Sequence, residues 1–360
     1  MIKTLFPTKD ATLYEITASA NTGLDQILEI RKDISSSAGP LFVSRPVLQF
    51  DTTTLSSSLA AEGINTGSDS GSLKYFLKMY VSQEVDVPIE YKLVVHPLRE
   101  AWDMGTGRFN SDPKVTNGCS WSNKTTGAAW TDAGGYFFSG SHASESVVQT
   151  FNNVAGDINI DVTDIIESYH NNTKTNFGFI VKRSGSQETD DNEFGYLAYF
   201  SKETNTIYSP RLEARYEDVS SIFNSTTGSV ATINDNITIS PKLQQEYKYG
   251  DISRIFVDIN KQYTARSQAG SVGTIYRCFL PSSSSFAIKD LATDEYVYEH
   301  DEKYTKVGRT GNTLNYFDLD TKGLFPGRHY CVEFKVNYYS GTKVISTKHY
   351  KPDLYFKVVK

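Results

Sequence analysis

The residues best suited to chemistry in this 360-residue chain are its three tryptophans, Trp102, Trp121 and Trp130, which fall in one short stretch. Exposed indole faces could form a platform for sugar rings, because an aromatic face packs well against apolar CH groups. The same bulk can instead close a core, and Gly134-Gly135 indicates backbone with positive φ or a close approach. Burial is the preferred interpretation, and carbohydrate binding by Trp102, Trp121 and Trp130 is the alternative.

A second group able to do chemistry is acidic: Asp190, Asp191 and Glu193 could offer oxygen ligands to Ca²⁺. A solvated loop is the simpler interpretation of these carboxylates. The six histidines are scattered, and the sequence contains no His-Glu-x-x-His, no Gly-x-Ser-x-Gly elbow and no phosphate-binding loop. We therefore expect a protein that is not an enzyme, with no catalytic residue, no metal site and no cofactor.

The elements that must position these residues are predicted to be strands. The chain has 23 Tyr and 20 Phe against 3 Met, a usage that favours strands over helices. Two tyrosines near the C-terminus, Tyr338 and Tyr339, could anchor an interface if they are exposed. With so many tyrosines, most are expected to be ordinary strand residues.

Charge is uneven along the chain. Residues 1–217 hold 18 Lys/Arg against 27 Asp/Glu, a net charge of −9, and residues 218–360 hold 18 against 15, a net charge of +3. Neither part has a dense basic stripe, so nucleic acid is not an expected partner.

The expected compartment follows from the cysteines and the N-terminus. Cys119, Cys278 and Cys331 are odd in number and widely spaced, which indicates free buried thiols rather than disulfides or a zinc site. The first residues lack the apolar core of a signal peptide, and no later stretch is long and apolar enough for a membrane span. We expect a protein that folds in a cytoplasm without a signal peptide and has no membrane partner.

The spacing of strand and turn signals predicts two β domains joined by a linker. Residues 1–217 are expected to form a jelly-roll-like β-sandwich with one short helix, which follows a strand at 157–160 and uses Asp161 or Thr163 as its N-cap. Residues 56–72 read as a surface loop. Residues 218–248 are polar and read as the linker, and residues 249–360 as a smaller Ig-like β domain. Expected strands in the latter are 252–259, 275–280, 286–290, 296–298, 314–319 and 330–339.

A series of short segments within residues 3–217 resembles, in its order, the DNRLRE-type β-sandwich, a module related to carbohydrate-binding modules. They are the Pro-Thr-Lys-Asp-Ala-Thr-Leu-Tyr run at 7–14, residues 45–51, the Trp102 stretch, 117–121, Trp130 with Gly134-Gly135, 160–166, 176–180 and 210–212. The order of these pieces carries the resemblance. One departure is Tyr169, where the family usually has Trp.

The remaining residues resemble, more loosely, a small β module of phage tail and neck proteins, through residues 286–290, 301–307, 316–319 and 324–330. Together the two resemblances imply a structural protein of a tailed-phage virion, at the neck, tail or baseplate. It would assemble with other virion proteins and with copies of itself, the C-terminal module docking and the N-terminal sandwich projecting. The alternative is a carbohydrate-binding module that recognises a bacterial surface polysaccharide.

Overall fold

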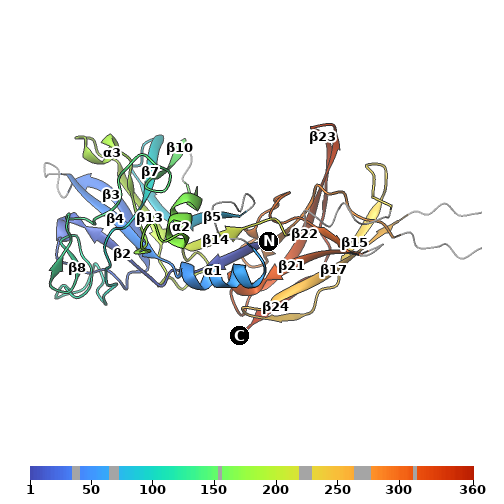
Figure 1. Cartoon of the computed structure of the whole chain (residues 1–360), viewed down its shortest axis with the longest axis horizontal. Coiled ribbons are helices and arrows are strands. Elements are labelled where there is room, and N and C mark those ends of the chain that lie inside the picture. Colours follow the sequence, from blue (N-terminus) through green and yellow to red (C-terminus); the bar gives the residue numbers. More distant parts are fainter. Residues whose placement is uncertain (35–40, 65–72, 153–155, 219–228, 263–276, 311–313) are drawn as a thin grey trace, which may run out of the picture. The chain divides into compact units, whose positions relative to one another are not determined.

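The computed structural model describes the chain except for residues 35–40, 65–72, 153–155, 219–228, 263–276 and 311–313. In the described residues strands dominate and helices are short, which confirms the predicted all-β fold (Figure 1). The chain divides into two compact units, one formed by Thr4–Ala214 and one formed by Met1–Lys3 with Arg215–Lys360. We call them the N-terminal unit and the C-terminal unit, and describe each by itself.

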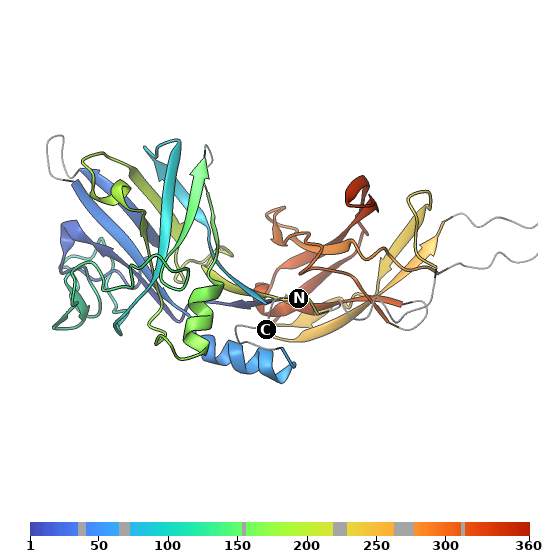
Figure 2. The same cartoon turned by 45° about the horizontal axis from the view of Figure 1, so that its top comes forward.

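Two sheets build the N-terminal sandwich (Figure 2). One sheet has four strands in the order β1 (Ile2–Leu5), β14 (Arg211–Arg215), β5 (Lys74–Met79) and β11 (Ile158–Asp161). The other has eight, in the order β10 (Val147–Asn152), β7 (Glu90–Pro97), β12 (Phe179–Arg183), β4 (Leu41–Gln49), β3 (Ile27–Ile34), β13 (Gly195–Phe200) and β6 (Val81–Val85), with β2 (Lys9–Tyr14) paired to β4.

Period-two alternation places the side chains between these sheets. In β5, Tyr75, Leu77 and Met79 are buried and the residues between them are not. Successive residues of a strand point to opposite faces, so this pattern fixes which face of β5 meets the core.

The prediction of a single short helix was wrong, because the described residues contain α1 (Thr52–Ala61), α2 (Thr163–His170) and α3 (Ser186–Thr189). Helix α1 covers the first part of the expected loop 56–72. The Asp51 side chain caps it by accepting a hydrogen bond from the Thr54 N–H at 3.2 Å, and Leu55 and Leu59 form a buried i, i+4 pair. Because the segment is rich in Ser and Thr, its two inward leucines do not stand out as a helical pattern in the sequence.

Helix α2 lies where the sequence predicts it, with Ile165, Ile166 and Tyr169 buried. Its N-cap position is Val162 rather than Asp161 or Thr163. The Asp161 carboxylate nevertheless accepts a hydrogen bond from the Thr163 N–H at 2.9 Å, and so satisfies a free donor at the start of the helix.

Two sheets also build the C-terminal unit. One has the order β15 (Ile237–Pro241), β17 (Ile252–Lys261), β21 (Leu314–Asp320) and β20 (Gly308–Thr310). The other has the order β16 (Glu246–Lys248), β24 (Tyr355–Val359), β22 (His329–Ser340), β18 (Ser284–Asp290) and β19 (Tyr296–Tyr298), with β23 (Lys343–Tyr350) paired to β22. Between them Phe317 stacks on Phe286 at 4.3 Å and meets the edge of Phe334 at 6.0 Å.

Two expectations for this unit need correction. The linker expected at 218–248 contains β15 and β16, because Ile237, Ile239 and Tyr247 turn inward and join the core. Pro241 is tolerated because β15 is an edge strand. The strand expected at 275–280 is reduced to isolated bridges at Arg277 and Phe279, residues 275 and 276 lying outside the described part.

Strands β23 and β24 are not among the strands expected from the sequence. Strand β23 is exposed over most of its length, so it lacks the buried alternation that marks a strand. A two-residue turn links it to β22, since Ser340 pairs with Lys343 and Gly341 has φ of 62°. Glycine at the first turn position is what such a hairpin requires.

Candidate functional site

The three tryptophans lie in one buried cluster of the N-terminal unit. Trp102, Trp121 and Trp130 are 1%, 9% and 5% exposed and pack with Leu13, Val47, Ile180 and their neighbours. They belong to the loops around β8 (Asn123–Thr125) and β9 (Ala128–Ala129), teal-green in Figure 1. The indole N–H groups are also used: Trp102 donates to the Phe177 carbonyl and Trp130 to the Ser120 carbonyl, both at 2.9 Å. These three residues therefore offer little indole surface to a sugar.

Trp121 is held by a charged network that the sequence did not suggest. The Arg45 guanidinium lies 4.8 Å from the Trp121 ring centre and donates to both Glu188 carboxylate oxygens at 2.8 and 3.1 Å. Lys182 also pairs with Glu188, and burial lowers the pKa of Lys182 while Glu188 opposes that shift. Because no motif links β4, β12 and α3 in sequence, only the fold could reveal this structural network.

In the acidic cluster of Asp190, Asp191 and Glu193, Asp190 forms an ion pair. Lys32 is buried, and its ammonium lies 2.5 Å from an Asp190 carboxylate oxygen. The hydrogen bond from Lys32 lowers the pKa of Asp190. Asp191 and Glu193 are exposed. Within the described residues, no group of three or more His, Cys, Asp or Glu side chains is placed to hold a metal ion.

Exposed apolar side chains gather instead in the C-terminal unit. Among the described residues, 14 large hydrophobic side chains are exposed, and 11 of them belong to this shorter unit. They are Val230, Tyr249, Ile252, Phe256, Leu291, Tyr296, Tyr339, Val344, Ile345, Leu354 and Tyr355. Exposed apolar surface concentrated in this way is typical of regions that bind partners or ligands.

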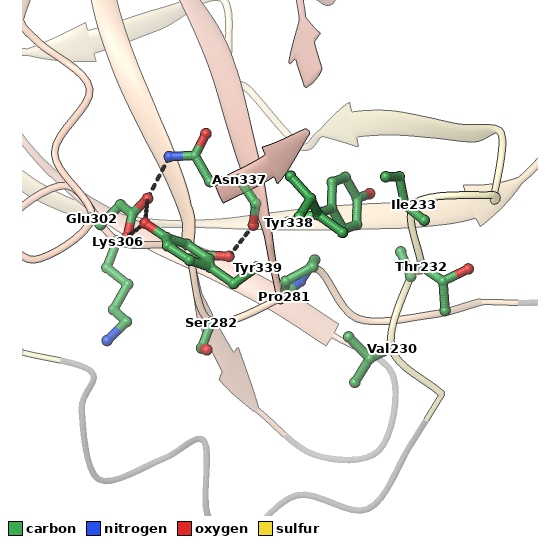
Figure 3. A pocket seen from close by; sticks show the side chains of 13 residues that line it. Val230, Thr232, Ile233, Pro281, Ser282, Glu302, Lys306, Asn337, Tyr338 and Tyr339 are labelled. Atoms are coloured by element: carbon green, nitrogen blue, oxygen red, sulfur yellow. Dashed lines mark hydrogen bonds between the residues drawn. The ribbon is translucent and has the colours of Figure 1, made fainter. Parts of the chain in front are cut away.

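A pocket of about 630 Å³ lies at the β22–β23 end of the C-terminal unit (Figure 3). Figure 3 shows Glu302, Asn337 and Tyr339 turned toward one another, with Val230, Thr232 and Ile233 across the pocket. Tyr338, Ile345, Pro281, Ser282, Ser283, Ala231 and Lys306 complete the lining. The volume lies within the range of about 300–1,000 Å³ usual for small-molecule sites.

Glu302 organises the polar side of this pocket. The Tyr339 hydroxyl donates to both Glu302 carboxylate oxygens, at 2.9 and 3.0 Å, and the Asn337 side-chain amide donates to one of them. The bond to Glu302 raises the pKa of Tyr339. Lys306, the cation of the lining, pairs with Glu217 at 2.9 Å. The pocket therefore combines an oriented aromatic ring with a carboxylate and an amide.

Of the two tyrosines that the sequence singled out, the structure exposes one. Tyr338 is 7% exposed and belongs to the core, while Tyr339 is 43% exposed and lines the pocket. Consecutive strand residues face opposite sides, so only one of the pair could be exposed. Glu302 sits in the loop between β19 and β20, and no sequence signal connects it to β22.

No family model and no curated protein matches the chain. Among the described residues, no helix is long and apolar enough to cross a bilayer.

Proposed function

We propose that the chain is a non-enzymatic structural protein of a tailed-phage virion, which assembles at the neck, tail or baseplate through interfaces of its C-terminal unit. The observation that carries this proposal is the concentration of exposed apolar side chains in that unit. The virion location is supported by two resemblances: the order of DNRLRE-like segments in residues 3–217, and the following module, which resembles phage tail and neck proteins. Virion proteins of this kind act by repeated contact between copies, so no residue needs a catalytic role.

The outer face of β17 offers the surface best suited to such contacts. Ile252 and Phe256 are 47% and 40% exposed and flank Arg254 on the same face of the strand. Arg254 is fixed in place, because it donates to both Asp318 carboxylate oxygens at 2.8 Å and lies 4.1 Å from the Tyr316 ring centre. A rigid arginine between two exposed apolar side chains has the composition of an interface hot spot.

The N-terminal sandwich would be the projecting part in this proposal. Residues 1–217 carry a net charge of −9, and the N-terminal unit contributes 3 of the 14 exposed large hydrophobic side chains, Ile16, Ile89 and Val148. A strongly acidic surface with scattered apolar residues favours solvation over close packing.

Mass spectrometry of washed particles, made from the phage genome that encodes this chain, tests the virion location. We expect the protein at a stoichiometry set by the symmetry of one ring or sleeve. A second preparation that expresses the Ile252→Ser/Phe256→Ser variant should contain less of it, or none. Wild-type particles that lack the protein would contradict the proposal.

The alternative, carbohydrate binding by Trp102, Trp121 and Trp130, would require the tryptophan loops to open, since all three indoles are buried. No change in tryptophan fluorescence is therefore expected when bacterial polysaccharides are added. A shift caused by one polysaccharide would favour the alternative.

A further inference from the structure

The outer face of the six-stranded sheet of the C-terminal unit carries a continuous row of side chains. On β22 this face presents alternate residues from Cys331 to Tyr339, and Cys331, Glu333, Lys335, Asn337 and Tyr339 all belong to it. Eight residues of strand separate Cys331 from Tyr339, a distance of about 26 Å at 3.3 Å per residue. The face is therefore long enough for an extended ligand.

One end of this face is the pocket around Tyr339. The Tyr339 ring is exposed, yet its hydroxyl is held by both oxygens of Glu302, so its orientation is fixed before any ligand arrives. Glu302 also accepts a hydrogen bond from the Asn337 side-chain amide. A carboxylate offers about four acceptor sites, so Glu302 can still accept a hydrogen bond from a ligand hydroxyl.

At the opposite end of this face a tyrosine is again held by a glutamate. Register places Tyr355, Cys331, Lys289 and Tyr296 in one row across β24, β22, β18 and β19. Tyr296 and Tyr355 are 41% and 62% exposed. The Tyr296 hydroxyl donates to a Glu333 carboxylate oxygen at 2.7 Å, so this tyrosine too is oriented by a glutamate.

Between the two ends the face is polar. Lys335 pairs in register with His349, and Asn337 with Thr347, on β23. The His300 ring lies 5.9 Å from that of His349. Burial, with His349 and Lys335 nearby, lowers the pKa of His300 to about 4, so this ring is uncharged at neutral pH. The Lys335, His349 and Thr347 side chains can exchange hydrogen bonds with a ligand that carries many hydroxyls, whereas His300 Nε2 is buried and His300 Nδ1 faces the Ser285 hydroxyl.

In composition, this face differs from the assembly surface on β17. The core of a protein interface is depleted of charged residues, whereas Lys335 and His349 lie midway along this face and Glu333 lies toward its Tyr296 end. Nucleic acid is disfavoured as well, because Glu302 and Glu333 would place a negative charge beside the tyrosines on which bases would stack.

Cleavage of a bound chain is not expected. Glycosidases use two carboxyl groups about 5–9.5 Å apart across the scissile bond. Glu302 is the single carboxylate among the described residues that line the pocket. Glu333 is four strand residues from Asn337, about 13 Å along β22. Each glutamate also accepts a hydrogen bond from a tyrosine hydroxyl, so its role is to orient that tyrosine.

We infer that this face binds an uncharged saccharide chain, with one sugar ring stacked in the Tyr339 pocket and another over the Tyr296–Tyr355 end. Aromatic faces would meet the CH surfaces of the sugar, and Glu302, Asn337 and the side chains between the ends would bond its hydroxyls. The inference goes beyond the proposed assembly and uses a face other than the outer face of β17, on which the assembly test depends, so either can fail alone.

Saturation-transfer NMR and calorimetry of the full chain, with neutral hexasaccharides and disaccharides of glucose, N-acetylglucosamine, galactose and rhamnose, test the inference. At least one hexasaccharide should bind, and at least 10-fold more tightly than its disaccharide. Tyr339→Ala and Glu302→Gln should each weaken binding of both lengths at least 10-fold. Tyr296→Ala should weaken the hexasaccharide and leave the disaccharide unchanged.

Two further variants keep the result interpretable. Tyr339→Phe retains the ring and loses the bond to Glu302, so it should recover part of the affinity lost in Tyr339→Ala. Ile89→Ser, an exposed apolar residue of the N-terminal unit outside both proposed surfaces, should bind as the wild type does. Near-ultraviolet circular dichroism checks that each variant is folded. The inference would be overturned by a panel without a binding saccharide, by binding that ignores Tyr339 and Glu302, or by a Tyr339→Ala variant that instead changes the oligomer mass.

Discussion

Gly134 shows at the residue scale how a sequence signal becomes a packing requirement. Its φ is 81°, and a Cβ at this position would lie 2.7 Å from Cη2 and Cζ2 of Trp121. The neighbouring Gly135 has φ of 99°, so the positive φ expected from the Gly-Gly pair is confirmed. The contact with Trp121 itself could not be predicted, because the two residues come together only after the loop has folded.

Gly134→Ala should therefore destabilise the folded protein more than an alanine substitution at another glycine with positive φ. Gly127 has φ of 75° and no neighbouring atom within 4 Å of the place its Cβ would take, so Gly127→Ala should cost about 1–2 kcal/mol for its left-handed backbone alone. Gly134→Ala adds an overpacking cost of about 1–3 kcal/mol. Urea unfolding of both variants measures the difference, and equal losses would show that contact with Trp121 adds nothing.

Asp10 is a second residue whose environment was invisible in the sequence. It lies in the run at 7–14, is buried, and accepts a hydrogen bond from the Lys202 N–H at 2.7 Å. Burial raises the pKa of Asp10 to about 7, against the opposing influence of Lys202. Between pH 4 and 7 the folded chain therefore retains a proton that the unfolded chain has lost.

Stability should consequently fall as pH rises through this window, and level off above pH 7. Each unit of pKa difference corresponds to about 1.4 kcal/mol. Asp10→Asn has no proton to lose, so it should gain stability relative to the wild type between pH 4 and pH 8. Urea midpoints of both proteins across this range measure the effect. A difference that stays constant with pH would contradict the assignment to Asp10.

At the scale of elements, Asn21 connects the tryptophan loops to the loop between β2 and β3. It is fully buried, and its amide donates to the Met104 and Cys119 carbonyls at 2.7 Å each. Its side-chain oxygen accepts from the Gly107 and Gly23 N–H groups at 2.7 and 3.2 Å. One side chain thus satisfies four backbone groups, three of them on the loop 104–119.

Asn21→Ala should leave those backbone groups buried without partners, at a cost of about 3 kcal/mol or more. The exposed Asn117 bonds only to Thr106 in the described contacts, so Asn117→Ala should cost less than about 1 kcal/mol. In Asn21→Ala, tryptophan fluorescence should change at lower urea than far-ultraviolet circular dichroism, because the loops open first. Coincident transitions would argue against a locally held loop.

Predictability differed between kinds of element. Strands with one buried face, such as β5 and β22, carry an alternation that the sequence shows, and α2 has an inward stripe of Ile165, Ile166 and Tyr169. Helix α1 and strand β23 lack such a signal. The first is Ser-rich with two inward leucines, and the second is exposed along most of its length. Their formation depends on capping and on pairing with β22.

At the scale of the whole molecule, the candidate site was the part least accessible to sequence reasoning. In the sequence Tyr339 is a candidate interface anchor, but its partner Glu302 lies 37 positions away in a loop. The three tryptophans, the most conspicuous cluster in the sequence, are core residues. The residues of the candidate site share one face only because the register of β22 with its neighbours brings separate segments together.

Assembly through the C-terminal unit is the central claim, and light scattering of the purified chain tests it most directly. The account predicts a mass that is a multiple of 40.2 kDa. Ile252→Ser/Phe256→Ser should reduce this mass to that of the monomer, while Val148→Ser, an apolar residue of the N-terminal unit exposed to 48%, should leave it unchanged. A wild-type chain that stays at 40.2 kDa at every concentration, or an oligomer that survives the double substitution, would contradict the account.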